Sequence, residues 1–363
     1  MNQLKVAVIG GGHLGRIHTR LLSQNPRFEL VSVADTEDST CEKLAAEFGV
    51  ETTNDYHSLV GKIDAAVIAT PTASHYAIAK DLLANGIHVL IEKPVTNTTA
   101  QAEHLVALAA EKNLTLQVGH VERFNPAFQE ARRLIKRPRY IEANRMSGYT
   151  MRSTDVGVVL DLMIHDIDLV VSLVNSPLVE SRAIGVSVFG PHEDIAQARL
   201  EFEDGTVANL TASRCSFEAA RTISWFSEEG FVSADLAAGK VQQVSLSSMI
   251  ETNEFRDIQQ RDASQISAIQ SGLFSQVLPT ENVAVEPLNA IECEHLDFAD
   301  AMQNQCSPTV TGHHGKRAVE IAESICQAID QHRWQDGDAQ RTGAQALQAD
   351  LLSMPASPQR RAA

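Results

Sequence analysis

Short apolar runs alternate with helical patterns over the first 120 residues of the chain. The runs are rich in β-branched residues and carry few polar positions. Near-continuous apolar strands separated by helices are typical of a parallel sheet covered on both faces. The sequence therefore predicts a doubly wound α/β domain. We expect strands at Lys5–Ile9, Glu29–Ala34, Ala65–Ala69, His88–Ile91 and Thr115–Val118, and helices at Leu14–Ser23, Thr40–Phe48, His75–Asn85 and Ala100–Lys112.

After Val121 the segments become longer and alternate apolar with polar residues. Such alternation is typical of a mainly antiparallel sheet with one solvated face. Glu203-Asp204-Gly205-Thr206 is a tight-turn sequence between two of these segments. The region therefore predicts an α+β domain with an open sheet. We expect its strands at Arg182–Phe189, Ala196–Phe202, Thr206–Cys215 and Arg221–Ser227, and its helices at Pro126–Arg137, Val158–Val174, Ala290–Gln303 and His314–Gln331.

These patterns divide the chain into a doubly wound domain at 1–121, an α+β domain at 122–333 and a tail at 334–363. The last two predicted helices are expected to close the second domain. Residues 251–285 carry little periodicity and are expected to form a long loop or insertion. The tail is rich in Ala, Gln, Asp, Ser and Pro, a composition that favours a flexible segment.

The charge and composition of the chain exclude some classes of binding partner. The net charge of −16 argues against a general affinity for nucleic acid or for an anionic membrane. No apolar run approaches the length of a membrane span, and the first one, Val6–Ile9, is too short for a signal peptide. The five cysteines are scattered, with no Cys-x-x-Cys pair, so neither a zinc ribbon nor a disulfide framework is indicated. A cytoplasmic protein with reduced thiols fits best.

The turn after the first strand has the pattern Gly-x-Gly-x-x-Gly, formed by Gly10, Gly12 and Gly15. In a strand–turn–helix context these glycines permit a tight turn, let the backbone approach a pyrophosphate and let the helix pack closely on the strand. The phosphates then lie at the positive end of the helix, so His13 and Leu14 are also expected to contact the cofactor. A glycine turn without a ligand is the alternative.

Asp35 ends the second strand, 20 residues after Gly15. A carboxylate there accepts hydrogen bonds from the ribose hydroxyls and repels a 2′-phosphate, which favours NAD over NADP. A helix N-cap is an alternative role that is compatible with the first. Thr70 and Pro71 end another strand at the same edge and are expected to line the cofactor, as is His75, although a helix-capping turn explains them nearly as well.

Glu92, Lys93 and Pro94 follow the next strand, which puts both charges at the carboxyl edge where the nicotinamide is expected, so Glu92 and Lys93 are both expected to contact the cofactor. A lysine there could orient a substrate hydroxyl and take part in its proton transfer, so Lys93 is a candidate for catalysis as well as for cofactor and substrate binding. An ordinary surface ion pair is the alternative for this motif taken by itself.

Asp161 and His165 are four apart within an apolar helical segment, so they should stand one turn apart on one face. A carboxylate beside an imidazole fixes its orientation and supports its protonated form, which suits a general base. A buried histidine satisfied by a neighbour is one alternative. A metal held with Asp168 is another, but a metal would ordinarily require further His or Cys ligands, so we predict none.

Taken in order, the glycine turn, Glu-Lys-Pro and the Asp–His helix resemble the Gfo/Idh/MocA family of oxidoreductases over residues 4–332. The resemblance implies a Rossmann domain, NAD chemistry on a sugar-like hydroxyl, and Lys93, Asp161 and His165 as the reaction site. The family helix usually has glycine where this chain has Met163. Relatives in the family are commonly dimers or tetramers, so we expect a homo-oligomer formed through the exposed sheet face.

The segment from Val118 to Pro126, read with the helix from Asp161 to Asp166, resembles the branch of that family which oxidises UDP-N-acetylglucosamine at C3. A local excess of basic residues could receive a diphosphate, although a solvated helix face explains it equally well. We expect Arg123, Asn125 and Arg152 to bind substrate, together with Lys93 and His165. The basic residues are Arg123, Arg132, Arg133, Lys136, Arg137, Arg139, Arg145 and Arg152.

These features predict an NAD-dependent dehydrogenase of a sugar or nucleotide sugar. Oxidation of a free polyol or simple sugar, or reduction of a keto compound, remains the first alternative. A sensor that binds NAD without turnover is the second. It would not require Lys93, Asp161 and His165 together, and the chain shows no helix-turn-helix or basic arm for DNA.

Overall fold

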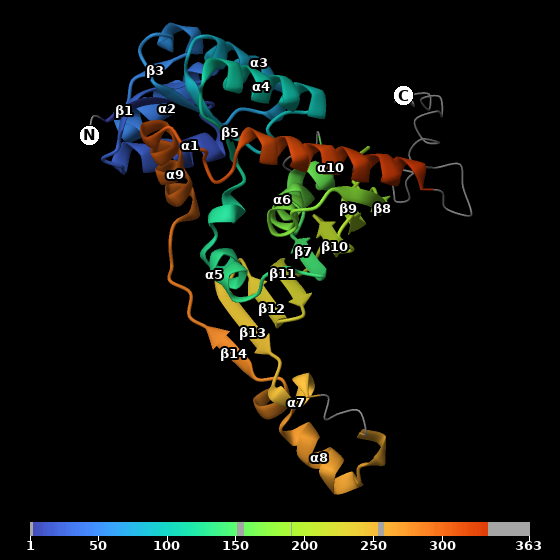
Figure 1. Ribbon diagram of the computed structural model, residues 1–363. Helices are drawn as coiled ribbons and strands as arrows, with labels where there is room; N and C mark the ends of the chain where they lie inside the picture. The colour runs from blue at the N-terminus through green and yellow to red at the C-terminus, as the bar shows by residue number, and fades with distance from the viewer. Residues whose placement is uncertain (1–2, 151–155, 190, 253–257, 333–363) are drawn as a thin grey trace, which may run out of the picture.

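The first sheet is parallel throughout, with strands in the order β3-β2-β1-β4-β5-β6. The computed structural model describes residues 3–150, 156–189, 191–252 and 258–332 (Figure 1). The predicted doubly wound domain is confirmed. Its strands are β1 (Leu4–Ile9), β2 (Phe28–Ala34), β3 (Thr52–Thr53), β4 (Ala65–Ile68), β5 (His88–Glu92) and β6 (Leu116–Gly119), and its helices are α1 (His13–Gln24), α2 (Asp38–Phe48), α3 (Thr72–Ala84) and α4 (Thr99–Lys112).

The order of the strands reverses between β1 and β4, since the chain builds outward from β1 in both directions. Ligands of such sheets lie outside the carboxyl ends of the strands at this switch point. The strands on either side are almost wholly buried, which their runs of Val, Ile and Ala predict. The fold thus brings the turns after β1, β2, β4 and β5 to one edge.

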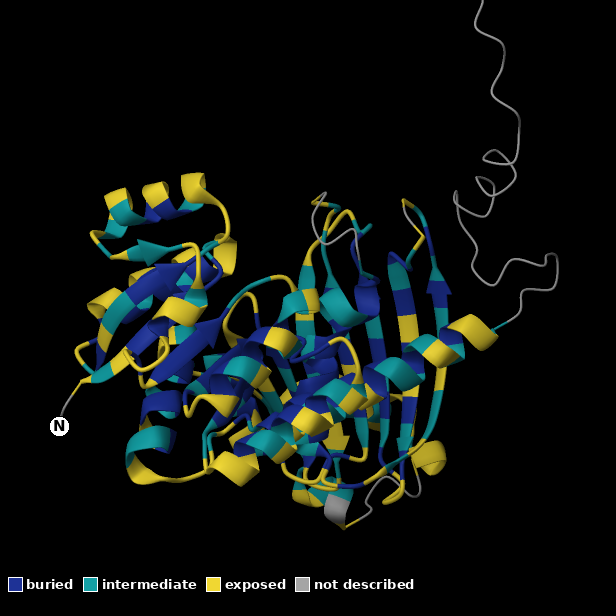
Figure 2. Ribbon diagram, turned by 90° about the horizontal axis from the view of Figure 1, so that it is seen from above, coloured by how far each residue is buried: buried dark blue, intermediate teal, exposed yellow. Residues whose placement is uncertain are grey.

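The second sheet has eight strands in the order β14-β13-β12-β11-β7-β10-β9-β8, and only the β7–β10 pair is parallel. One face carries helices α5, α6 and α10, and the other is uncovered within the described chain (Figure 2). The predicted open antiparallel sheet is confirmed. Its strands are β7 (Tyr140–Met146), β8 (Leu178–Val186), β9 (Ile195–Phe202), β10 (Val207–Ser213), β11 (Ala220–Ser227), β12 (Gly230–Asp235), β13 (Lys240–Ser245) and β14 (Thr280–Val283).

Some predicted elements differ from the structure, and the strand expected at Arg182–Phe189 is found as β8 at Leu178–Val186. The helix from Pro126 ends at Leu134, where α5 gives way to extended backbone. The long helix over 158–174 is divided into a π-helical turn, Val159–Met163, and α6 (Ile164–Leu173). The region 251–285, expected to be irregular, contains α8 (Ala263–Ser271), a second π-helical turn (Leu273–Val277) and β14, just after the short helix α7 (Ser248–Glu251).

The helix α9 (Ala290–Asn304) packs on the first domain, although the sequence order predicted that it would close the second. Phe298 and Ala299 join a buried cluster with Val8, Leu22 and Leu90 of the parallel sheet and α1. The apolar face of α9 therefore decides its position, and the chain returns to the second domain only with α10 (Gly312–Gln331). The predicted flexible tail from 334 lies outside the described residues, and none of the described helices is long and apolar enough to cross a membrane.

Candidate active site

The glycine turn has the geometry that a pyrophosphate site requires. Gly10 has φ of +101°, and a Cβ there would meet Ala69 O at 2.6 Å. A Cβ on Gly15 would lie 1.8 Å from Gly10 O, so helix and turn are in contact. Around Gly12, by contrast, no atom lies within 4 Å of that position. No side chain caps the start of α1, so its first N–H groups remain open to an anion.

Asp35 stands directly beside this turn. One carboxylate oxygen accepts the backbone N–H of Gly11 at 2.6 Å, and the other accepts that of Glu37 at 2.9 Å. Each oxygen keeps a second lone pair for a ribose hydroxyl. The structure therefore places Asp35 against the glycine turn that is predicted to bind the pyrophosphate. His13 and Leu14 begin α1 with exposed side chains at the same edge.

Thr70 and Pro71 form the turn into α3, and His75 lies in the first turn of that helix. His75 is buried, with Nδ1 at 2.9 Å from Pro94 O and Nε2 at 2.8 Å from Thr70 O. Burial lowers the pKa of His75, so the neutral ring donates to one carbonyl at a time. The ring connects the β4–α3 turn to the turn after β5, where the Lys93–Pro94 peptide is cis. A contact from His75 to the cofactor would require the ring to leave these carbonyls.

Lys93 joins the two domains. Its Nζ donates to the backbone carbonyl of Asp161 at 2.7 Å and lies 3.8 Å from Oδ1 of the same residue. Burial lowers the pKa of Lys93, the charges of Asp161 and Glu92 oppose that shift, and Arg145 adds to it. The ammonium group therefore stands at the carboxyl edge of β5, facing the start of α6. Sequence reasoning predicted this meeting of Lys93 and Asp161 at one site.

His165 lies one turn beyond Asp161, but the predicted contact between the two side chains is not formed. No hydrogen bond joins them in the described parts of the chain, because the π-helical turn Val159–Met163 changes the spacing and Asp161 faces Lys93 instead. Burial, and then Lys93, Arg145, His120 and Arg221, hold the pKa of His165 well below its usual range. The surroundings therefore favour the neutral ring, and the expectation that a carboxylate supports its protonated form is wrong.

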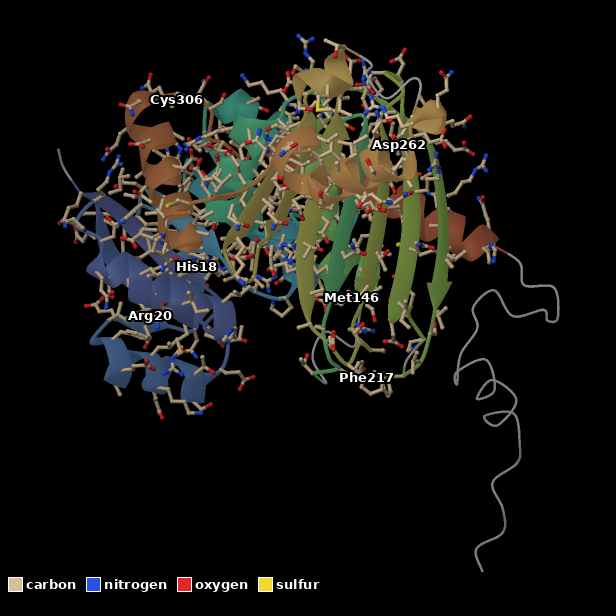
Figure 3. The ribbon with its side chains drawn as sticks, turned by 90° about the horizontal axis from the view of Figure 1, so that it is seen from below. His18, Arg20, Met146, Phe217, Asp262 and Cys306 are labelled. Atoms are coloured by element: carbon tan, nitrogen blue, oxygen red, sulfur yellow. The ribbon has the colours of Figure 1, made fainter. Side chains whose placement is uncertain are left out.

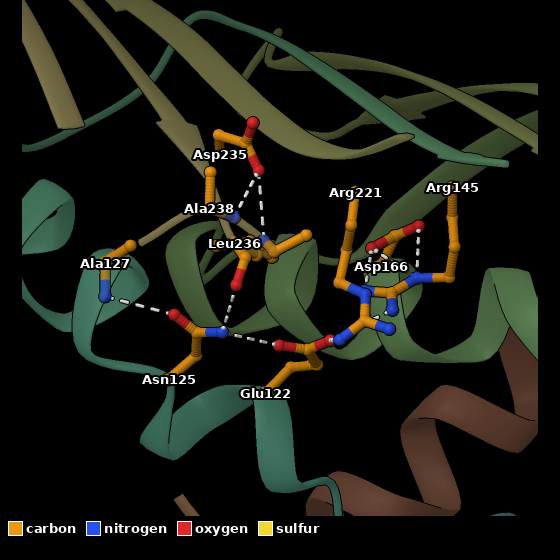
Figure 4. A network of polar contacts seen from close by, with 10 residues as sticks. Glu122, Asn125, Ala127, Arg145, Asp166, Arg221, Asp235, Leu236 and Ala238 are labelled. Carbon is orange, nitrogen blue, oxygen red and sulfur yellow. Dashed lines mark hydrogen bonds and ion pairs between the residues drawn. The ribbon is translucent and has the colours of Figure 1, made fainter. Parts of the chain in front are cut away.

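Sequence reasoning missed a network of ion pairs around Glu122, Arg145 and Asp166, the residue that follows His165 (Figure 4). Arg145 forms a bidentate pair with Asp166 and reaches Glu122 at 2.9 Å. Arg221 approaches the same Glu122 oxygen at 3.2 Å, with about half of its side chain exposed. Arg145 is the one charged residue on the inward face of β7, a strand that was not predicted. Had this strand been predicted, a charged residue at an inward position would have pointed to the network.

Asn125 and Arg123, predicted to bind substrate, have internal partners. Arg123 is buried and pairs with Asp168 at 2.8 Å. Asn125 caps α5 and donates to Glu122 and to Leu236 O. Substrate contacts from either would require the side chain to leave these partners. Arg152 lies outside the described residues. Because Arg123 and Arg145 are both buried in ion pairs, the predicted basic run does not act as one free cationic surface.

Glu92 faces the interior rather than the cleft. It bonds His18 Nε2 at 2.8 Å, and His18 Nδ1 lies 2.7 Å from His295 Nε2 on α9. His18 lies on α1, and Figure 3 shows it where α9 meets that helix. Burial alone would raise the pKa of Glu92, but His18 and Lys93 lower it. No pattern in the sequence pairs His18 with His295, because the contact depends on α9 returning to the first domain.

The glycine turn, the carboxylate at the end of β2 and a lysine with a histidine at the nicotinamide end define a dinucleotide-dependent dehydrogenase with a second, open-sheet domain. Residues 4–120 match the family described as the oxidoreductase family with an NAD-binding Rossmann fold, and residues 125–232 match the Gfo/Idh/MocA C-terminal domain. The chain belongs to the Gfo/Idh/MocA family of oxidoreductases, and its cofactor is NAD.

Similar proteins act on sugars and polyols. UDP-N-acetylglucosamine 3-dehydrogenase of Acidithiobacillus ferrooxidans is 32% identical over 331 residues, which cover 91% of this chain and 98% of that protein. A solved structure of that enzyme superposes with a TM-score of 0.79 and covers 90% of this chain and 98% of its own. The NAD⁺-dependent scyllo-inositol 2-dehydrogenase of Bacillus subtilis is 29% identical over 234 residues, covering 59% of this chain and 68% of its own.

Proposed function

We propose that this enzyme oxidises the C3 hydroxyl of UDP-N-acetylglucosamine, or of a closely related nucleotide sugar, to the 3-oxo sugar. Support comes from similarity over nearly the whole length of an enzyme with that activity. The observation that carries the chemistry is the contact of Lys93 Nζ with Asp161, which brings groups from two domains beside His165 at the nicotinamide end of the sheet.

The residues divide the reaction between them. The neutral ring of His165 takes the hydroxyl proton at Nε2, and Lys93 donates a hydrogen bond to the same oxygen and stabilises its developing negative charge. Asp161 holds the ammonium group of Lys93 in place. NAD⁺, when bound, accepts the hydride of the carbinol carbon. In this proposal Gly10, Gly12, Gly15 and Asp35 bind the cofactor, which the open space at Gly12 and the bond of Asp35 to Gly11 support.

The substrate diphosphate requires positive charge near the cleft. Arg221 is half exposed and close enough to His165 to influence it, so we add it to Arg123, Asn125 and Arg152 as a substrate contact. Its bond to Glu122 leaves other guanidinium donors free to bind phosphate oxygens.

The assay is NADH formation with UDP-N-acetylglucosamine, with loss of two hydrogens from the sugar checked by mass spectrometry. Lys93→Met should lower kcat by about 10²- to 10⁴-fold while NAD⁺ still binds, since the glycine turn is untouched. Lys112→Met on the surface of α4 is the control. An enzyme that turns over the nucleotide sugar equally well without Lys93 would contradict the assignment.

Oxidation of a free polyol is the second candidate, favoured by the similarity to scyllo-inositol 2-dehydrogenase. The same assay with inositols and with glucose decides between the two. A kcat/KM that is highest for a free polyol, together with no thermal stabilisation by UDP-N-acetylglucosamine in the presence of NAD⁺, would replace the first candidate with the second.

We further propose that the enzyme works in the cytoplasm as a homo-dimer or homo-tetramer. The uncovered face of the second sheet carries an aromatic patch formed by Tyr140, Phe226 and Phe231, with ring centroids 5.9 and 4.3 Å apart. An aromatic patch on an otherwise polar sheet face is typical of protein–protein contact. The cysteines among the described residues are free thiols, which suits a reducing compartment.

A further inference from the structure

His165 lacks the hydrogen bond that a general base of this kind requires. A histidine that accepts a proton at Nε2 carries its own hydrogen on Nδ1, and an acceptor on that side fixes the tautomer. In the described structure Nδ1 of His165 is buried and has no hydrogen-bond partner. Asp161, which might have served, is held by Lys93. A buried polar atom left without a partner calls for an explanation.

The structure offers His120 as the neighbouring group. It follows β6 at the carboxyl edge, is 1% exposed, and its backbone is fixed by bonds to Val118 O and from Arg123 N. Both of its ring nitrogens are buried without a partner among the described residues. Arg145 donates to both Glu122 and Asp166, so the residues just after His120 lie against the part of α6 that carries His165.

Beyond His120 lies a carboxylate with a free oxygen. Asp168 is wholly buried on α6, and its Oδ2 accepts Nε of Arg123 at 2.8 Å. Its Oδ1 has no hydrogen-bond partner in the described chain. Arg123 connects the two residues, because its backbone N–H donates to His120 O at 3.0 Å and its Nε donates to Asp168 Oδ2. Asp168 therefore stands near His120 with an acceptor to spare.

These unpartnered atoms are complementary. Asp168 Oδ1 can only accept, a neutral His120 has one donor and one acceptor, and His165 Nδ1–H can only donate. We propose that His120 is a positioning residue that links His165 Nδ1 to Asp168, so that the carboxylate which orients the general base is Asp168, acting through His120, and not Asp161. In this proposal each link is a direct hydrogen bond or passes through one bridging water.

One arrangement satisfies all of these atoms. His165 Nδ1–H donates to one nitrogen of His120, the other nitrogen of His120 donates to Asp168 Oδ1, and Nε2 of His165 presents its lone pair to the cleft. When Nε2 takes the substrate proton, Nδ1 keeps its own, so no proton travels along the link. The positive charge that forms on His165 is then supported by Asp168, against the surrounding cations. The charged and titratable groups that face the two rings are Lys93, Glu92, Arg145, Arg123, Arg221 and His314.

The role of His120 rests on the proposed dehydrogenase chemistry, but its direct test needs no substrate. Nitrogen NMR of ring-labelled histidines in the NAD⁺-bound protein reports which nitrogen of each ring carries hydrogen, and His165→Gln assigns the signals. We expect Nδ1–H on His165 in the wild type, and a shift toward Nε2–H in His120→Phe. A wild-type His165 that carries its hydrogen on Nε2 would overturn the proposal, whether or not any variant folds.

Kinetics give an independent readout. His120→Phe should lower kcat by roughly 10- to 100-fold with little change in KM, as loss of an orienting partner does. It should also displace the acid limb of the kcat–pH profile, and His120→Gln, which keeps a donor and an acceptor, should restore most of the rate. His104→Phe, on the exposed face of α4, is the control. An unchanged His165 tautomer in His120→Phe contradicts the link. If the wild type is inactive toward nucleotide sugars but the tautomer of His165 still depends on His120, only the proposed substrate is contradicted.

Discussion

Lys93 shows how burial and local charge adapt an ordinary side chain to proton chemistry. Burial lowers its pKa, while Asp161 and Glu92 oppose the shift. The ammonium group is thus less stable than it would be in water, yet it is held at 2.7 Å from Asp161 O. A donor of this kind can stabilise an alkoxide strongly, because its charge is poorly solvated before the substrate binds.

Asp35 is the residue that should set the choice of cofactor. Replacing it with alanine removes the negative charge that repels a 2′-phosphate, so the ratio of kcat/KM for NAD⁺ to that for NADP⁺ should fall by about tenfold or more. The loss of its bond to Gly11 lowers both values alike, which is why the ratio is measured. Asp38→Ala, at the start of α2, serves as the control. A ratio that stays constant in Asp35→Ala would remove Asp35 from the ribose site.

At the scale of elements, substitutions at two glycines of the turn between β1 and α1 should affect stability and cofactor binding separately. Gly15→Ala would place a Cβ 1.8 Å from Gly10 O and should cost about 1–3 kcal/mol of unfolding free energy. Gly12→Ala meets no atom within 4 Å, and its φ of −65° suits alanine, so stability should change by less than about 0.5 kcal/mol.

Gly12→Ala should instead weaken the binding of the cofactor. The new methyl of Gly12→Ala occupies the space through which the pyrophosphate approaches, so the Kd for NADH should rise by about tenfold or more. Urea unfolding and NADH fluorescence titration measure the two effects. A Gly12→Ala protein that binds NADH normally would show that the pyrophosphate lies elsewhere.

The helix α9 carries a buried carboxyl group into the first domain. Burial, and then Glu92 and Asp297, raise the pKa of Glu294 well above its ordinary value of 4.5. Because the folded pKa exceeds the unfolded one, the stabilising contribution of this group is complete below that ordinary value and is lost as the pH rises through the folded pKa.

Glu294→Gln removes this titration with little change in shape. Relative to the wild type, its unfolding free energy should therefore increase as the pH rises above about 4.5, by at most about 1.4 kcal/mol per pH unit. Urea unfolding between mildly acidic and mildly alkaline pH measures the difference, with the exposed Glu292→Gln as the control. A difference that does not vary with pH would show that Glu294 ionises normally.

At the scale of the whole molecule, one face of the second sheet carries helices, and we propose that the uncovered face contacts another subunit. Phe226 is 43% exposed at the centre of the aromatic patch. Phe226→Lys should convert the proposed oligomer to a smaller species, because burying the charge costs several kcal/mol. Light scattering after gel filtration measures the mass, with Phe217→Lys, at the fully exposed position 217, as the control. An unchanged oligomer in Phe226→Lys would move the interface to another surface.

The two domains were predictable to different degrees. Strands of the parallel sheet are buried on both faces, so their apolar runs are distinct, and all five predicted ones are found. The second sheet gave a weaker signal. β7 places Arg145 on its inward face and was not predicted, and the short strands β12 and β13 have too few apolar positions to be distinguished from loops.

The sequence by itself determined the parallel sheet, the glycine turn and the presence of Lys93, Asp161 and His165, because each depends on local spacing or on a residue type that has few other uses. Only the tertiary structure decided how these residues meet. The π-helical turn directs Asp161 to Lys93, α9 brings His295 to His18, and the segment after β6 brings Arg123 to Asp168. Such contacts join residues that are distant in the chain, and packing rather than periodicity selects them.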